Sequence, residues 1–406
     1  MSEKFNVFAH RDFSLFVAVC FLTNIIAQTQ GVAVGWDLYE RTGSPLALGF
    51  VGLANFLPVL ILFIPAGQIA DRYDRRKIVE ASLAVWALGT AALAAAALLG
   101  AGVTWLYLGC ILTSIANVLH RPARDALLPQ LVPPEAIPNA VAWNSSVFQI
   151  ASVAGPALAG IAIAVTGSAA SVYIFNTAAG LLSVVMAAMI KARGQRVARP
   201  PVTFPELFAG MRHVWKTKVV LGVLALDMFA VLLGGATALL PVYAKDILHV
   251  GPAALGWLSA APAIGAFGMA LYQGTSKRPV YRPGVTFFWA VAGYGLATVV
   301  FGVSTVFWLS FVALMLTGVT DNIGVVIRMT VVQLHTPDEL RGRVSAVNRV
   351  FVSSSNELGA LESGLLANFT NPVFTVVAGG VATVLIAMAA AKVFPDLRRM
   401  KTLAPP

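Results

Sequence analysis

The sequence predicts an all-α membrane protein whose twelve transmembrane helices form two six-helix repeats. Of its 406 residues 58% are hydrophobic and only 11% are charged, whereas soluble domains carry about 25% charged residues. Long apolar stretches recur along the whole chain, and a helix needs about 20 such residues to cross a bilayer. Internal repetition is visible as well, because Gln130-Leu-Val-Pro-Pro-Glu135 recurs as Gln333-Leu-His-Thr-Pro-Asp338.

The apolar segments and the loops between them predict the domain organisation. We expect spans at residues 12–36, 46–70, 78–99, 103–127, 138–166, 169–191, 218–243, 253–275, 284–303, 306–329, 343–367 and 372–394. The longest hydrophilic stretch lies between the sixth and the seventh span and is rich in Arg and Pro. The predicted domains are therefore an N-terminal six-helix bundle over 1–191, a cytoplasmic basic linker over 192–217 and a C-terminal six-helix bundle over 218–406.

The distribution of cations predicts the orientation of the chain. With twelve spans, 26 of the 28 Lys and Arg residues fall on the side that holds both termini, and only Arg41 and Lys245 fall on the other. Cytoplasmic loops carry such an excess of cations, so we expect both termini in the cytoplasm. The net charge of +10 is then explained by topology and lipid headgroups, and we expect no nucleic-acid partner.

One polar loop, between the second and the third span, carries an unusual set of residues. It reads Gly67-Gln-Ile-Ala-Asp71-Arg72-Tyr-Asp-Arg75-Arg76-Lys. Its cations alone would fit a clamp that holds two helices at the membrane surface. A glycine one turn before a carboxylate favours a conformational latch instead, with close backbone approach and a charge aimed at a helix N-terminus.

Ionisable residues within the spans predict a site, since each costs at least about 2.5–3.5 kcal/mol at the centre of a membrane helix. The candidates for proton coupling are Asp227, Glu362, Glu357 and Asp321. Asp227 is our first choice, because no cation neighbours it in sequence and the first repeat has Thr23 at the matching position. A buried carboxyl group whose access alternates can exchange protons.

Polar residues of other spans are candidates for lining a substrate cavity. These are Asn24, Gln28, Trp36, Asn117, Arg124 and Arg328. Two alternatives stay open, because the amides can equally well join helices by hydrogen bonds and Arg328 can act as an anchor that reaches the membrane surface.

Several motifs resemble a known family. The loop from Gly67 to Arg76 resembles the loop between helices 2 and 3 of the major facilitator superfamily, although Asp74 stands where that motif usually has a second glycine. Ala33-Val-Gly-Trp36 and Ser355-Asn-Glu-Leu-Gly359 resemble the enterobactin-exporter and macrolide-efflux type of bacterial drug:proton antiporters. Gly155, Pro156 and Gly160 resemble the helix-5 motif associated with antiporters.

The resemblance spans essentially the whole chain and implies a function. It implies a major facilitator fold in a bacterial inner membrane, alternating access, and export of a small molecule coupled to proton entry. The cargo would be a drug-like amphiphile or a siderophore, and we expect a functional monomer that needs no cofactor other than the proton gradient. Proton-coupled uptake and facilitated diffusion remain alternatives.

Enzyme chemistry has little support in the sequence. The five histidines are scattered at segment ends without the spacing of metal ligands, and no Ser/His/Asp grouping or phosphate-binding glycine loop is present. We therefore expect neither catalytic residues nor a metal site. A polytopic membrane enzyme that acts on a lipid-soluble substrate is the distant alternative.

Overall fold

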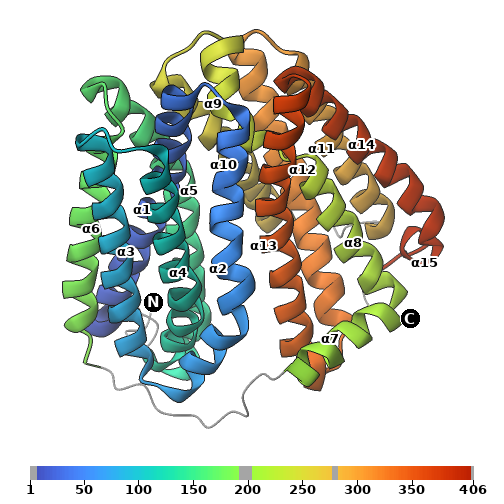
Figure 1. Cartoon of the computed structure of the whole chain (residues 1–406). Coiled ribbons are helices and arrows are strands. Elements are labelled where there is room, and N and C mark those ends of the chain that lie inside the picture. The colour runs from blue at the N-terminus through green and yellow to red at the C-terminus, as the bar shows by residue number, and fades with distance from the viewer. Residues whose placement is uncertain (1–6, 192–203, 277–281, 404–406) are drawn as a thin grey trace. The chain divides into compact units, whose positions relative to one another are not determined.

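The computed structural model describes residues 7–191, 204–276 and 282–403. The basic linker expected over 192–217 therefore lies partly outside the described residues, and only its last part is seen, as the surface helix α7 (Phe204–Lys216). The described chain is helical throughout, which confirms the predicted fold class (Figure 1).

The long helices follow the predicted spans closely. In the first repeat they are α1 (Arg11–Thr42), α2 (Pro45–Arg72), α3 (Arg75–Leu98), α4 (Val103–Leu127), α5 (Ile137–Thr166) and α6 (Ala170–Ala188). In the second repeat they are α8 (Lys218–Leu233), α10 (Pro252–Thr275), α11 (Pro283–Val303), α12 (Phe307–Leu334), α13 (Asp338–Phe369) and α14 (Pro372–Val393). Short elements are α9 (Leu240–Val242) and α15 (Pro395–Arg398).

Among the described residues, 11 helices are long and apolar enough to cross a membrane by length and composition. The long helix outside that set is α13, which has 32 residues but carries many polar and charged side chains. Since its length exceeds the roughly 20 residues that a bilayer requires, α13 completes the twelve-helix arrangement.

Turn residues explain where several helices begin and end. Asp74 lies before α3 and its Oδ1 accepts a hydrogen bond from the backbone N–H of Arg76 at 3.0 Å, which is N-terminal capping. Asn371 caps α14 in the same way. Gly167 ends α5 with a φ of 71°, a left-handed conformation that glycine adopts without steric cost.

One predicted span is interrupted. The sequence predicted a continuous segment over 218–243, but α8 ends at Leu233 and the chain continues through Gly234 and Gly235 into a 3₁₀ turn (Ala236–Leu239), α9 and a π-helical turn (Tyr243–Ile247). Two adjacent glycines disfavour a helix interior. The hydroxyl of Tyr294 also donates a hydrogen bond to the carbonyl oxygen of Gly234, which satisfies a backbone group that the interrupted helix leaves free.

The chain divides into two compact units. The first unit comprises Met1–Thr42, Ala54–Val202 and Pro252–Gly256, and the second comprises Gly43–Leu53, Thr203–Gly251 and Trp257–Pro406. Each unit therefore consists mainly of one repeat, together with a short stretch at the beginning of α2 or α10.

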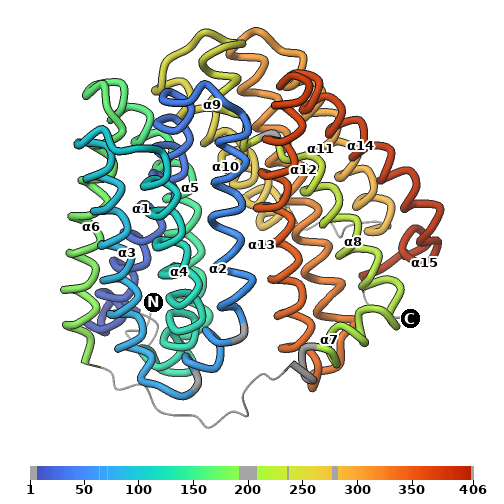
Figure 2. Tube along the Cα trace, in the orientation of Figure 1, coloured from blue at the N-terminus to red at the C-terminus, as the bar shows by residue number. Residues whose placement is uncertain are grey.

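The same helix pairs form in both units. In the first, α1 packs on α5 and α6, and α3 packs on α4 and α6. In the second, α8 packs on α13 and α14, and α11 packs on α12 and α14. These are the pairs expected if helices of equal rank in the two repeats have equal neighbours, and the path of the chain through them can be followed in Figure 2.

Glycines allow the closest helix contacts. A Cβ atom at Gly295 of α11 would lie 2.7 Å from the carbonyl oxygen of Gly380 in α14, and one at Gly380 would lie equally close to the carbonyl oxygen of Gly295. In the small-residue stripes of α5 and α13, Gly155 lies against Gln28 of α1, and Gly359 lies against Leu232 of α8. Small residues therefore join helices within each unit, as is usual where lipid supplies no hydrophobic force between helices.

Candidate functional site

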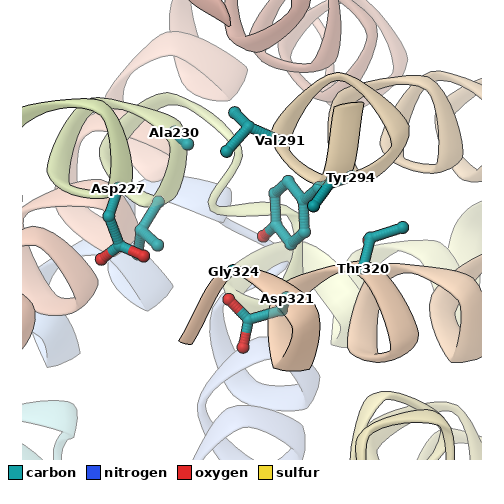
Figure 3. A pocket seen from close by; sticks show the side chains of 9 residues that line it. Asp227, Ala230, Val291, Tyr294, Thr320, Asp321 and Gly324 are labelled. Carbon is teal, nitrogen blue, oxygen red and sulfur yellow. The ribbon is translucent and has the colours of Figure 1, made fainter. Parts of the chain in front are cut away.

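A small cavity inside the second unit is lined by three helices and contains two carboxyl groups. Its lining residues are Asp227, Ala230 and Val231 of α8, Ala290, Val291 and Tyr294 of α11, and Thr320, Asp321 and Gly324 of α12. Figure 3 shows Asp227 on one side of the cavity, Asp321 on another and the ring of Tyr294 beside them. About 20 Å³ is available to the centre of a water molecule, which is room for about one water.

Asp227 forms an ion pair with a residue far away in sequence. Its Oδ2 accepts a hydrogen bond from Nη1 of Arg328 on α12. Asp227 is 8% exposed and Arg328 is 6% exposed, so the pair joins two helices in the interior of the unit. Removing one partner of a buried ion pair leaves an uncompensated charge, which costs about 3–5 kcal/mol.

Arg328 has a hydrogen-bond donor to spare. Its Nε is buried and makes no hydrogen bond with any described residue. A guanidinium group carries five N–H donors, and a buried donor without a partner costs about 1–3 kcal/mol. The ion pair with Asp227 therefore leaves Arg328 able to bind a second acceptor or a water molecule.

Asp321 lies in the same cavity without such a partner. Within the described part of the chain its carboxyl group makes no ion pair and no hydrogen bond. It precedes Arg328 by seven residues on α12, which places the two on nearly the same helix face about 10 Å apart along the axis. The hydroxyl of Tyr294 already donates to Gly234 at 3.2 Å, so its oxygen is left as an acceptor.

The first unit contains a different ion pair, in which Asp37 is buried and Arg41 is exposed. Asp37 and Arg41 of α1 are joined by two contacts, from Nε to Oδ1 at 2.7 Å and from Nη2 to Oδ2 at 3.3 Å. Tyr173 of α6 donates its hydroxyl proton to Oδ2 of Asp37 at 3.3 Å. Arg41 also donates to the carbonyl oxygen of Ala101 at 3.0 Å, so this cluster fastens the end of α1 to α6 and to the turn before α4.

The first turn of α3, which follows the loop after α2, is tied to the ends of other helices of the first unit. Arg75 is buried and donates to the carbonyl oxygen of Ala126 at 3.2 Å. Arg76 pairs with Glu80 at 2.6 Å and donates to the carbonyl oxygen of Ala188 at 3.0 Å. These contacts are those of a clamp on α4 and α6.

Comparison with known proteins agrees with this architecture. The model of the transmembrane secretion effector family, one of the major facilitator families, matches residues 2–405. The chain belongs to this family. It is 29% identical over 381 residues to the multidrug efflux pump Tap of Mycobacterium tuberculosis, covering 86% of each chain. It is 26% identical over 412 residues to the enterobactin exporter EntS of Citrobacter koseri, covering 98% of this chain and 95% of the relative.

Solved structures support the fold. A bacterial homologue of the human lysosomal transporter Spinster, inward-facing and occupied, aligns with a TM-score of 0.75 at 15% identity over 98% of each chain. A mutant of the peptide transporter POT aligns with a TM-score of 0.76 at 12% identity over 97% of this chain and 95% of that chain. As a member of a major facilitator family, the protein is a multi-pass membrane transporter of small molecules and not an enzyme.

In this member of the transmembrane secretion effector family, some of the predicted proton-coupling residues lie close together and others do not. Asp227 and Asp321 share the cavity, and Arg328 joins them through its pair with Asp227. Glu357 and Glu362 are partly buried on α13 and are absent from the cavity lining. Ser363 donates its hydroxyl proton to Glu362 at 3.4 Å.

The predicted cavity residues of the first unit are mostly engaged in contacts between or along helices. Gln28 donates to Ser152 of α5 at 3.0 Å. Asn117 accepts a hydrogen bond from Arg121 at 3.1 Å, and Arg124 pairs with its neighbour Asp125 at 2.8 Å. Asn24 and Trp36 are partly buried on α1. For Gln28 the structure favours the alternative that the sequence left open, a side chain that joins two helices.

The residues of the latch and helix-5 motifs lie in α2, α3 and α5. Asp71 lies in α2 with a side chain outside the described residues, and Arg72 is exposed. A Cβ at Gly67 would meet no described atom within 4 Å, so the expected close approach is not seen there. Pro156 is buried in α5, and Gly160 lies against Gly256 at the beginning of α10, inside the first unit.

Two parts of these sites were missed in the sequence. Tyr294 is a hydroxyl-bearing residue in the middle of an otherwise apolar span, which is a usable signal. Asp37 was not among the candidates, although the spacing of four to Arg41 is that of an ion pair along one helix face. No signal in a single sequence indicates that Arg328 pairs with Asp227.

Proposed function

We propose that the protein exports a small amphiphilic molecule across the bacterial inner membrane by alternating access, driven by protons that enter in exchange. Membership of a secretion family and likeness to a multidrug pump and a siderophore exporter support the direction of transport. Both termini lie in the cytoplasm in this proposal, because 26 of the 28 cations then fall on the cytoplasmic side. Its cargo belongs to one of two classes, a drug-like amphiphile or a siderophore.

The observation that carries proton coupling is the unpaired Asp321 beside a buried ion pair. Asp321 takes up the proton, while Asp227 keeps Arg328 in place. This assignment changes the order of the sequence-based candidates, because Asp227 proves to have a cation partner. An acid that lacks such a partner inside a membrane protein has the strongest physical reason to be protonated in one state.

The geometry suggests how a proton would bias the unit. When Asp321 is protonated, Arg328 is attracted only to Asp227, and the acid can donate its proton to the free lone pairs of Tyr294 or to a water in the cavity. When Asp321 loses the proton, its negative charge competes for the spare Nε donor of Arg328. The two charge states therefore favour different positions of α12 relative to α8, which is the kind of differential interaction that shifts a conformational equilibrium.

Transport by purified protein in liposomes tests the proposal. A panel of cationic amphiphiles and siderophores should move against its own gradient when a pH gradient of the correct sign is imposed, and a protonophore should abolish this movement. Movement that only equilibrates the substrate would make the protein a facilitator. Movement in the same direction as the protons would make it an importer.

A further inference from the structure

The helix α7 has two sharply different faces. Val214 is 1% exposed, and Gly210 lies so close to the backbone of Arg343 on α13 that a Cβ atom would be 3.0 Å from its carbonyl carbon. The other face exposes two aromatic side chains, Phe208 at 62% and Trp215 at 66%, together with Arg212. One side of α7 is therefore fixed to the second unit, and the other side has no cover in the described chain.

The exposed side chains form one continuous stripe. Phe208, Arg212, Trp215 and Lys216 are spaced by four, three and one residues, which at 100° per residue places them within an arc of about 100°. Neither cation forms an ion pair within the described residues. We call this set the aromatic-basic stripe.

The position of α7 brings the stripe to the membrane surface. A single residue, Thr217, separates the end of α7 from Lys218, where the span of α8 begins. His213 anchors the helix further, because its Nε2 lies 3.3 Å from the carbonyl oxygen of His335, the residue that follows α12. The stripe consequently lies at the depth where spans α8 and α12 leave the apolar part of the bilayer.

We propose that the aromatic-basic stripe is a docking site for the anionic headgroups of the adjoining lipid leaflet. Aromatic rings prefer the headgroup region of a bilayer, and neighbouring Lys and Arg side chains can lay their apolar stems beside such rings while their charged ends stay among the headgroups. Arg212 and Lys216 supply the charge that phosphate-bearing lipids attract. Exposed Lys218 extends the same positive surface.

Lipid docking on α7 can affect the ion pair of Asp227 and Arg328, because the backbone connects α7 to α8. Thr217 donates its N–H to the carbonyl oxygen of His213, and its own carbonyl oxygen accepts the N–H of Leu221, so this one residue is hydrogen-bonded both to the end of α7 and to the beginning of α8. Asp227 lies on α8. Anionic lipid that holds α7 therefore restricts how α8 can move, and the transport rate should depend on the anionic fraction of the membrane. This consequence rests on the proposed function, whereas lipid docking itself does not.

A depth measurement tests the docking directly. A fluorophore is attached to Trp215→Cys after replacement of Cys20 and Cys110, which are both buried, and the protein is reconstituted with lipids brominated in the acyl chains. We expect strong quenching at this position. The matched control is Lys401→Cys, an exposed position near the C-terminal end, where quenching should be weak. Equal, weak quenching at both positions would overturn the proposal.

A binding measurement tests the lipid class. Vesicles that contain phosphatidylglycerol are compared with vesicles of phosphatidylcholine alone, and lipid retained by the purified protein is measured. The double substitution Arg212→Gln/Lys216→Gln should weaken retention of phosphatidylglycerol by about fivefold for each charge removed, and added salt should do the same to the unaltered protein. Arg399→Gln/Lys401→Gln removes as much charge from exposed residues outside α7 and should leave retention unchanged.

The outcomes separate docking from the proposed transport mechanism. If the double variant loses its selectivity for anionic lipid and its transport is no longer stimulated by such lipid, both the docking site and its effect on transport are supported. Unchanged retention in that variant overturns the lipid site, whatever transport does. Protection of the label at 215 only after addition of cytosolic protein would assign the stripe to a protein partner and would likewise overturn it.

Discussion

In each of the two units a buried aspartate pairs with an arginine, and the two pairs differ in what they connect. Asp37 and Arg41 lie one turn apart on α1, with both carboxylate oxygens engaged and a further hydrogen bond from Tyr173. The pair of Asp227 and Arg328 joins two helices and leaves the Nε of Arg328 without a partner.

The difference separates a fixed contact from one that can change. The geometry of a pair along one helix is set by that helix, and no movement between helices alters it. The distance between the partners of a pair that joins two helices changes whenever α8 and α12 shift. An unpaired acid such as Asp321 then offers the cation a second anion to pair with. The first pair is therefore suited to stability and the second to coupling.

The largest effect should come from breaking the pair between helices. Arg328→Gln leaves the carboxylate of Asp227 buried without its cation, and we expect transport to fall to background with a loss of stability of about 3–5 kcal/mol. Thermal unfolding in detergent and transport in liposomes measure both. The double variant Asp227→Asn/Arg328→Gln removes both charges and should recover most of the stability but not proton-driven transport. A double variant as unstable as the single one would show that the charge is not the cause.

Asp321→Asn should separate coupling from folding. The amide resembles the protonated acid and cannot release a proton, so proton-driven export should drop at least tenfold while exchange of substrate without a gradient persists. Stability should change little, because Asp321 has no ion pair to lose. Glu362→Gln is the matched control on α13 and should remain coupled. If Glu362→Gln is uncoupled and Asp321→Asn is not, the proton site belongs to α13.

Asp37→Asn should cost stability without affecting coupling. Arg41 is more exposed than Arg328, so its long side chain can reach water once its partner is gone. We expect a loss of about 1–2 kcal/mol, measured by thermal unfolding, and the same dependence of transport on the pH gradient as in the unaltered protein. A changed proton dependence would contradict the assignment of this pair to stability.

The smallest effect should come from the cap of α3. Asp74→Ala removes the side chain that accepts the N–H of Arg76 and should cost about 1 kcal/mol. The corresponding helix of the second unit, α11, begins with Pro283 and has no side-chain cap. Hydrogen exchange should therefore rise at the first turn of α3 in the variant, toward the level seen at the first turn of α11. No change in exchange there would mean that the contacts of Arg75 and Arg76 suffice to hold the first turn of α3 without the cap.

Sequence periodicity and composition predicted helix positions well because each span must satisfy its own backbone within lipid. The fifth span, predicted over 138–166, is found at Ile137–Thr166. The interruption after Leu233 was missed, although Gly234 and Gly235 mark it, since hydropathy alone does not register a broken helix.

The site was harder to predict than the fold because it depends on pairs that are distant in sequence. Asp227 was selected for lacking a cation nearby in the chain, yet Arg328 lies beside it in the structure. A single sequence indicates which residues share a helix face, as Asp321 and Arg328 do at their spacing of seven. A single sequence does not indicate which helix faces pack against each other. Tyr294 could not be assigned to the cavity without that information.

The contact of Gly295 with Gly380 has a consequence for how this transporter can be altered by mutation. Each glycine fills the space that a methyl group on the other would need. In a library of variants selected for a new cargo, both positions should therefore remain glycine, and not even alanine should replace them. Gly31 of α1, where a Cβ would meet no described atom within 4 Å, should accept alanine freely. Adaptation to new substrates would then be confined to side chains outside this seam, while α11 and α14 are inherited as one piece.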